Sequence, residues 1–265
     1  MSKQTGLIRL EGNIGGISFY KSGGDDLART ANGPSKERIL TDPAFVRTRE
    51  NNQEFGGAAT ASKALRLAFA NAVQTMTDRL FTARLTKLFK EVNARSTGVR
   101  GQRPITISAN RTLLTDLEFN VNTSFNSVFN APFTVTTTAA RTQATVALAA
   151  FAPATFIQSP AGATHFRLIA AMGVLSDFSY NTSIGKYEAA NPTLHLLRAG
   201  VSSAITALNS ATPVTFSLAP TLPGTPTMTA TVSVVLCLGV EFYQHVGTTD
   251  YLLAQGNAMK VVQVF

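Results

Sequence analysis

Apolar and polar positions divide the chain into three segments with different periods. Residues 1–41 carry short apolar runs separated by glycine-rich turns, and residues 42–97 carry apolar positions at helical spacing. From residue 105 onward, short runs rich in Thr, Val and Phe are separated by Pro and Gly. We therefore predict an α+β protein with a β-ribbon arm (1–41), a short helical region (42–104) and an antiparallel β-sandwich (105–265).

The first segment predicts three short strands, over Leu7–Leu10, Ile17–Tyr20 and Leu27–Thr30, joined by turns. A ribbon of this size cannot bury enough apolar surface to be stable alone. It must therefore lie on its own domain or on a neighbouring subunit, and the sequence leaves both arrangements open. The predicted assembly interface consists of the apolar side chains of this ribbon: Leu7, Ile8, Leu10, Ile14, Ile17, Phe19 and Tyr20.

The helical segment opens at Asp42-Pro43, because Asp caps free amides and Pro suits the first helical position. Apolar residues then recur at helical spacing as far as Met76, although Gly56-Gly57 is expected to break or bend the helix. A second helix is expected after Thr77-Asp78, with Phe81, Leu85, Leu88 and Val92 facing inward and Arg79, Lys87 and Lys90 facing outward.

The third segment predicts a series of short strands: Phe133–Thr138, Gln143–Ala150, His165–Ala171, Val214–Leu218, Thr229–Gln244, Tyr251–Ala254 and Met259–Phe265. In the longest, every second residue from Val232 to Phe242 is apolar, and Val235 and Cys237 lie on the opposite face. A strand that is apolar on both faces is covered on both sides. We therefore expect this strand to be central.

Charge is scarce and unevenly distributed. Charged residues make up 14% of the chain, against about 25% in an ordinary protein. A subunit that buries much of its surface against neighbours needs little charge, but a neutral surface rich in Thr and Ser is an equal alternative. Residues 1–111 hold 18 of the 23 basic residues and nine of the 15 acidic ones. A polyanion, or acidic patches on a neighbouring subunit, would suit this basic part.

Candidate catalytic residues are few. The three histidines, His165, His195 and His245, have no second ligand at a metal-binding spacing. A zinc site assembled by the fold is the minor alternative to structural histidines. Cys237 lies in an apolar strand, which favours a buried, unreactive thiol.

Two carboxylate pairs complete the inventory. Asp116 and Glu118 are expected on one face of a strand, and Asp25 and Asp26 in a turn, with nothing to shift their pKa values. The glycines at 12–16 lack the Gly-Lys-Ser/Thr ending of a phosphate-binding loop. We therefore expect no catalytic residue, no cofactor and no metal ion, and predict that the protein is not an enzyme.

A basic stretch follows the ribbon, and acidic residues are interleaved with its arginines. We interpret it as a polar joint made of Arg38, Asp42, Arg47, Arg49 and Glu50. Arginine pairs bidentately with carboxylate or phosphate, so the stretch suits either salt bridges or a polyanion. The interleaved acids favour salt bridges over a continuous nucleic-acid-binding surface.

Two motifs, GNIGGISFYK at 12–21 and TDPAFVRTREN at 41–51, are followed by Glu54-Phe55-Gly56. This pattern resembles a family of bacterial proteins of unknown function. The resemblance covers roughly the first 70 residues and implies a shared N-terminal module. It implies no catalytic residue, cofactor or activity.

The sequence therefore favours a non-enzymatic structural subunit that assembles with copies of itself into a filament, tube or virus-like shell. The alternatives are a nucleic-acid-binding or genome-packaging protein that uses the basic region, and a hydrolase or carbohydrate-binding sandwich. The N-terminus lacks the apolar core of a signal peptide, and the apolar run Val232–Val240 is too short to span a bilayer. We expect synthesis in the cytoplasm, with release as an assembled particle left open.

Overall fold

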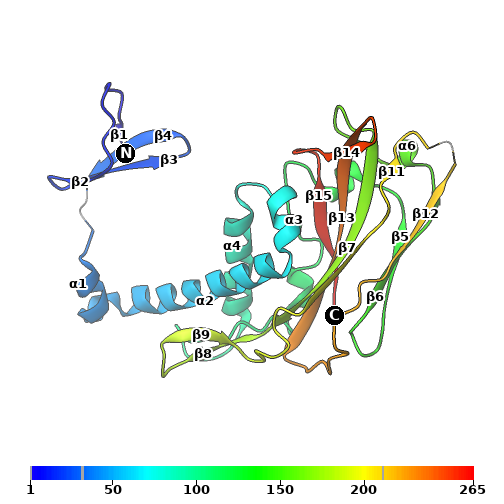
Figure 1. The fold of residues 1–265 in the computed structure, drawn as a ribbon. Coiled ribbons are helices and arrows are strands. Elements are labelled where there is room, and N and C mark those ends of the chain that lie inside the picture. Colours follow the sequence, from blue (N-terminus) through cyan, green and yellow to red (C-terminus); the bar gives the residue numbers. More distant parts are fainter. Residues whose placement is uncertain (1, 31–32, 211) are drawn as a thin grey trace. The chain divides into compact units, whose positions relative to one another are not determined.

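The structure is a computed structural model that describes residues 2–30, 33–210 and 212–265 (Figure 1). The chain forms two compact units, residues 1–49 and 50–265. The predicted α+β class is confirmed: a four-stranded antiparallel sheet is followed by helices and then by antiparallel sheets that include a curled half-barrel.

The sheet of the first unit has the strand order β1-β4-β3-β2. Its strands are β1 (Ser2–Lys3), β2 (Gly12–Ile14), β3 (Ile17–Ser22) and β4 (Asp25–Thr30). Two-residue turns at Gly15-Gly16 and Gly23-Gly24 join β2 to β3 and β3 to β4, and all four glycines have positive φ. Such turns match the twist of the flanking strands and require residues that tolerate positive φ, which explains the glycine pairs.

The strand predicted at Leu7–Leu10 is wrong. This segment lies outside the strands, and Gly12–Ile14 pairs with β3 instead. The side chain of Gln4 accepts a hydrogen bond from the amide of Leu10 at 2.9 Å and donates one to its carbonyl at 3.2 Å. A side chain therefore uses the backbone groups of Leu10 that a strand would pair.

A short helix, α1 (Lys36–Thr41), precedes the predicted helix start. The side chain of Asp42 then accepts a hydrogen bond from the amide of Ala44, which caps the 3-10 turn η1 (Pro43–Phe45), and α2 (Val46–Ala68) follows directly. The start signal at Asp42-Pro43 is therefore confirmed.

The break predicted at Gly56-Gly57 is wrong, because α2 runs through both glycines. A Cβ atom on Gly57 would lie 2.6 Å from the ring of Tyr187, whereas one on Gly56 would meet nothing within 4 Å. Gly57 therefore serves the close approach of an aromatic ring rather than a bend.

Three further helical elements follow: α3 (Ala70–Thr75), α4 (Phe81–Arg95) and the 3-10 turn η2 (Arg111–Leu113). In α4, Phe81, Leu85 and Val92 are buried as predicted, and Phe89 is buried as well. Lys90, expected to face outward, instead forms an ion pair with the buried Glu54 of α2.

Residues 105–265 form antiparallel sheets, as predicted. A six-stranded sheet contains β7 (His165–Ser176), β10 (Arg198–Ser202), β11 (Thr206–Ala207), β13 (Val232–Val246), β14 (Thr249–Leu252) and β15 (Ala258–Val264). A three-stranded sheet contains β5 (Phe133–Thr137), β6 (Ala144–Phe151) and β12 (Val214–Leu218). The remaining elements are the hairpin β8 (Phe178–Asn181) and β9 (Lys186–Ala189), with the short helices α5 (Phe125–Val128) and α6 (Pro153–Phe156).

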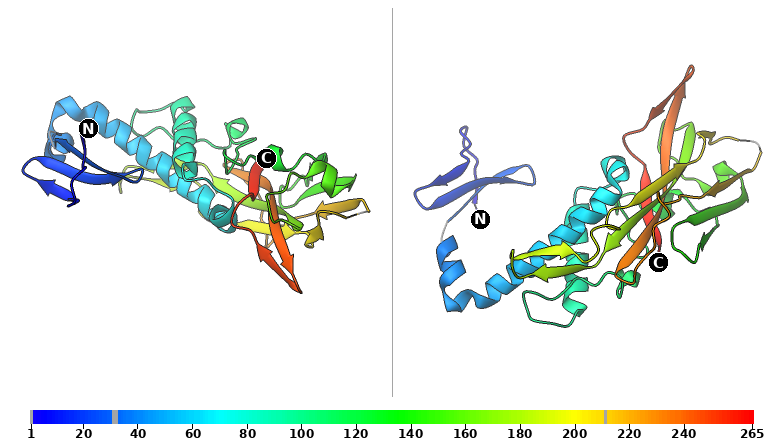
Figure 2. Two further views of the ribbon diagram at one scale, coloured as in Figure 1. Left: turned by 90° about the horizontal axis from the view of Figure 1, so that it is seen from above. Right: turned by 60° about the horizontal axis from the view of Figure 1, so that its bottom comes forward.

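Strand β13 is central and buried on both faces, which confirms its prediction. Its even-numbered residues from Val232 to Phe242 belong to a core shared with the three-stranded sheet. Val235 and Cys237 belong to a second core, shared with α2, α3 and α4. The layers are therefore helices, six-stranded sheet and three-stranded sheet (Figure 2), and of the predicted sandwich the structure shows antiparallel sheets that share a core.

The strand predicted around Asp116 and Glu118 is wrong, since the described segment there is a turn followed by an isolated bridge from Glu118 to Lys260. Asp116 has φ of 60°. The segment instead hydrogen-bonds to the edge of the large sheet, because the amide of Asp116 donates to the carbonyl of Val261.

Glu54 joins α2 to α4 and to the loop that follows α4. Its side chain is almost fully buried and accepts hydrogen bonds from Arg103 at 2.7 and 2.8 Å, from the amide of Gly101 at 2.9 Å, and from Lys90. Burial alone would raise the pKa of Glu54, but these hydrogen bonds outweigh it and lower the pKa from 4.5 to about 2.

We expect Gly57→Ala to destabilise the second unit by about 1–3 kcal/mol, because a methyl group would be forced into the Tyr187 ring. Gly56→Ala is the matched control on the same helix, and it should stabilise by about 0.5–1 kcal/mol because alanine favours helix. Urea unfolding followed by circular dichroism measures both. Equal effects of the two substitutions would contradict the assigned role of Gly57.

We expect Glu54→Gln to lower the free energy of unfolding by about 3 kcal/mol at pH 7, because the folded-state pKa lies well below 4.5. A depressed carboxyl pKa stabilises the fold above the unfolded value of 4.5, and this contribution is lost as the pH falls toward 2. The difference between wild type and variant should therefore shrink through this window.

Glu91→Gln is the control for this effect. Glu91 forms an exposed pair with Arg95 on α4, and its loss should change stability by less than about 0.5 kcal/mol. A difference between wild type and Glu54→Gln that stays constant down to pH 2.5 would show that the carboxylate charge is not the cause.

Candidate assembly surface

The first unit has no buried side chain among its described residues. Leu7 and Ile8 are fully or almost fully exposed, at 105% and 79%, and Ile14 is 56% exposed. Leu10 and Ile17 are exposed to a smaller extent, whereas Phe19 and Tyr20 are half-buried. A four-stranded sheet without a core lacks the apolar burial that normally stabilises such a sheet.

The register of the sheet divides the predicted interface between two faces. Ile14 lies opposite Ile17, and Phe19 lies opposite Ala28 on β4. Since side chains alternate along a strand, Ile14, Ile17 and Phe19 share one face and Tyr20 lies on the other. There the guanidinium of Arg29 stands 5.4 Å from the ring of Tyr20. We call Leu7, Ile8, Leu10, Ile14 and Ile17 the N-terminal apolar surface.

Ion pairs join charged residues within this unit, and its sheet has an unpaired strand edge on each side. Lys3 contacts Asp25 at 2.6 Å, and Arg9 contacts Asp26 at 3.5 Å. Within the described sheet, β1 and β2 each pair with one strand only. The outer backbone groups of an edge strand are free to extend the sheet of another molecule.

The structure brings three residues of the predicted polar joint together. Arg38 pairs with Asp42 at 3.1 Å, and Arg49 donates to the carbonyls of Ile39 and Asp42 at 2.8 and 2.9 Å. The amide of Ala44 and the guanidinium of Arg38 lower the pKa of Asp42 below its usual value. These contacts fix the turn between α1 and α2.

The other two residues of the predicted joint belong to α2. Arg47 is exposed in the first turn of α2. Glu50 belongs to the second unit, where its carboxylate lies 3.5 Å from Arg100.

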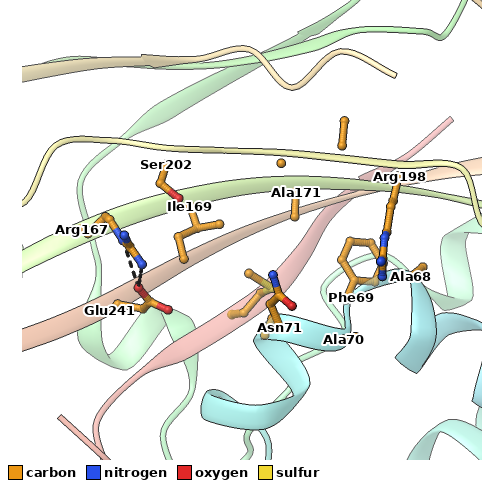
Figure 3. A pocket seen from close by; sticks show the side chains of 14 residues that line it. Ala68, Phe69, Ala70, Asn71, Arg167, Ile169, Ala171, Arg198, Ser202 and Glu241 are labelled. Carbon is orange, nitrogen blue, oxygen red and sulfur yellow. Dashed lines mark hydrogen bonds and ion pairs between the residues drawn. The ribbon is translucent and has the colours of Figure 1, made fainter. Parts of the chain in front are cut away.

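A cavity of about 420 Å³ opens in the second unit between the start of α3 and strands β7 and β10 (Figure 3). Its charged lining consists of Arg198 and the cross-strand pair Arg167 and Glu241. The hydroxyl of Tyr243 also donates to Glu241 at 2.7 Å. Burial and this hydrogen bond raise the pKa of Tyr243. Because three hydrogen-bond donors converge on Oε2 of this carboxylate, we interpret the network as structural.

Two side chains that often act in catalysis or metal binding, Cys237 and His195, have surroundings that favour a structural role here. Cys237 is fully buried in β13, and burial raises the pKa of its thiol well above the usual value. His195 is half-buried, accepts a hydrogen bond from the amide of Ser176 at 3.2 Å and packs edge-on against Phe178. Burial lowers the pKa of His195.

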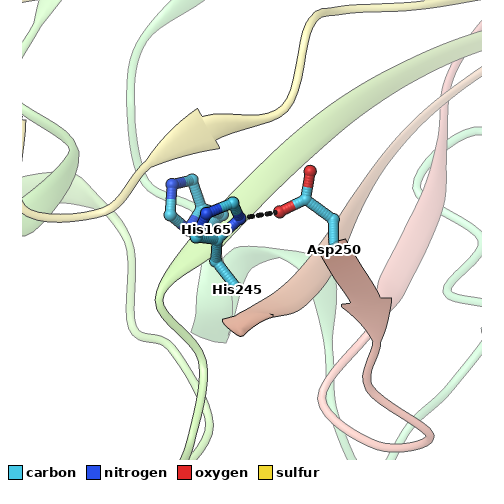
Figure 4. A group of neighbouring side chains, drawn as sticks. All are labelled: His165, His245 and Asp250. Carbon is cyan, nitrogen blue, oxygen red and sulfur yellow. Dashed lines mark hydrogen bonds and ion pairs between the residues drawn. The ribbon is translucent and has the colours of Figure 1, made fainter. Parts of the chain in front are cut away.

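The sequence analysis missed one cluster, made of His165, His245 and Asp250 (Figure 4). His165 begins β7, His245 lies near the end of β13, and the two are 80 positions apart in the sequence. Only the pairing of Tyr243 with His165 across the two strands brings them together. The hairpin turn after His245 was the one available signal, because it places Asp250 directly opposite His245.

None of the helices in the described ranges is long and apolar enough to cross a membrane. No protein-family model matches the chain, and comparisons with curated proteins and with solved structures find no match either. The resemblance of the first 70 residues to a bacterial family therefore stays a prediction, and function has to be argued from the surfaces and clusters described above.

Proposed function

We propose that the protein is a non-enzymatic structural subunit that associates with copies of itself through the N-terminal apolar surface. The single observation that carries this proposal is the exposure of Leu7, Ile8 and Ile14 in a unit whose described residues include no buried side chain. In this proposal the β-sandwich of residues 105–265 is the body, and the first unit is the connecting arm.

A second copy of the chain is the partner that fits best. An open sheet edge beside an apolar patch can pair with its own equivalent around a two-fold axis, or with a different edge in an open series. The low share of charged residues, 14%, also suits a chain whose copies cover one another's surface. A contact that repeats without closing would give a filament or tube, and one that closes would give a shell or ring.

The energies are consistent with such a contact. Burying one Leu or Ile side chain contributes about 1.5–3 kcal/mol. Association costs on the order of 4–15 kcal/mol before any contact is counted. Scaled by their exposed fractions, the five side chains of the N-terminal apolar surface on each of two copies contribute about 10–19 kcal/mol, which is enough to offset a cost in this range.

Ion pairs to buried carboxylates occupy three of the 18 basic residues in 1–111, which counts against a role of these three in genome packaging. Lys90 and Arg103 bind the carboxylate of Glu54, and Arg84 binds that of Asp78. Nucleic-acid binding needs cations that are free to neutralise phosphates, and these three are already paired.

We expect the double substitution Leu7→Ser, Ile8→Ser to shift the purified protein from large oligomers toward the monomer, as measured by sedimentation velocity and light scattering. Both side chains lie outside the strands and are largely exposed, so the fold should persist. Val99→Ser is the matched control, because Val99 is an exposed apolar residue (70%) of the second unit.

Two outcomes would contradict self-association through this surface, and two further results would favour a different role for the arm or for the chain. The proposal is contradicted if the wild-type protein is monomeric at all concentrations. It is also contradicted if the double variant assembles like the wild type. A monomeric wild type that the substitutions destabilise would show instead that the arm packs on its own chain. Oligomers that dissolve on nuclease treatment would favour the packaging alternative.

A further inference from the structure

His165, His245 and Asp250 come from three adjacent strands of the six-stranded sheet and converge at one end of it (Figure 4). One ligand atom from each side chain lies within 4.8 Å of those of the other two. The imidazole rings of His165 and His245 have centroids 5.0 Å apart, and Nδ1 of His245 lies 2.7 Å from Oδ1 of Asp250. Two imidazoles and one carboxylate are a common ligand set for first-row transition metals.

The hydrogen bonds around His165 engage Nδ1 and are compatible with Nε2 as its ligand atom. The hydroxyl of Thr164 donates to the carbonyl of Tyr243 at 3.4 Å and accepts from the amide of His245 at 2.8 Å. For the site we assign the imidazole N–H as the donor in the 2.9 Å contact between Nδ1 of His165 and this hydroxyl. The lone pair of His165 then lies on Nε2, and a neighbouring acceptor that holds the other ring N–H is typical of metal-binding histidines.

In the hydrogen bond between His245 and Asp250, Nδ1–H of the imidazole donates to the carboxylate, which can only accept. A divalent ion can take the place of that proton, with the imidazole proton moving to Nε2. Ligand atoms around a tetrahedral ion lie about 3.3 Å apart, given metal–ligand distances of about 2.0–2.1 Å. The three ligand atoms now lie within 4.8 Å of one another, so small side-chain rotations would bring them to the distances that a bound ion requires.

A cavity of about 390 Å³ adjoins the two histidines and is lined by Ala163, Thr164, His165, Leu208, Asn209 and His245. Three protein ligands leave at least one coordination position of an ion open. The cavity gives room for water or a small anionic ligand at that position. It is a second observation, independent of the ligand geometry.

We propose that His165, His245 and Asp250 form a binding site for a divalent first-row transition-metal ion of the Zn²⁺ class. Both imidazoles provide nitrogen ligands, Asp250 provides the charged oxygen, and Thr164 orients His165. This inference does not depend on the proposed function, because the site lies in the second unit and uses none of the N-terminal apolar surface.

The test is a titration of untagged, chelator-treated full-length protein with Zn²⁺ by isothermal calorimetry, supported by competition with a chromophoric chelator. We expect one ion per chain. His165→Ala and His245→Ala should each weaken binding at least tenfold, and Asp250→Asn should weaken it by about 10–100-fold. The matched control is His195→Gln, because His195 is the only other histidine in the chain.

Co²⁺ provides a readout that does not depend on stability. Bound to the wild type, it should give the visible absorption of a low-coordinate nitrogen–oxygen site, and the spectrum should be absent in the His165→Ala, His245→Ala double variant. Circular dichroism of each variant checks that the fold is retained. The proposal is overturned if wild type binds Zn²⁺ no more tightly than the folded double variant, or if His195→Gln weakens binding as much as the cluster substitutions do.

Discussion

Burial of strand β13 on both faces is the constraint on which the second unit depends. One face completes the core that it shares with the three-stranded sheet, and the other completes the core beneath the helices. Neither core closes without it, because Leu236 and Leu238 face one layer while Val235 and Cys237 face the other. A polar residue at these positions would leave an unsatisfied group in one of two apolar cores.

The helices add a second requirement: α2 must be held against α4 and must also let the ring of Tyr187 approach its backbone closely. Glu54 fixes α2 to α4 through charged hydrogen bonds, and Gly57, three residues later, lets the ring of Tyr187 reach the helix backbone. Glycine and a buried carboxylate are unfavourable inside a helix when considered alone. Here each is explained by a partner that lies far away in the sequence.

This explains what the sequence could predict and what it could not. The strands β5, β6, β12 and β15 were predicted within a residue or two, because local alternation of apolar residues specifies them. Leu7–Leu10 was predicted as a strand because its residues favour one, but the side chain of Gln4 binds its backbone. Gly57 was misinterpreted because Tyr187 is 130 positions away. The short strands β8 to β11 have no clear alternation and form against partners that propensity does not show.

The candidate sites also divide into features that depend on local sequence and features that depend on distant strand pairing. Exposure of Leu7 and Ile8 agrees with the inference that the ribbon is too small to bury its apolar side chains. The cluster of His165, His245 and Asp250 was beyond the sequence, because it depends on the register between β7 and β13. Proposals that rest on local composition could therefore be made early, whereas those that rest on strand pairing required the fold.

The position of β13 along the chain also affects how the protein folds during synthesis. Its partner β7 precedes it by more than fifty residues, with Val232 paired to Ser176, and helices α2 to α4 are made earlier still. The apolar side chains that pack on β13 from both layers therefore stay exposed until residues 232–246 have left the ribosome. Such non-local pairing is slow and exposes intermediates to aggregation. We therefore expect the second unit to fold late, and a chain that stops before Val232 to leave both layers open.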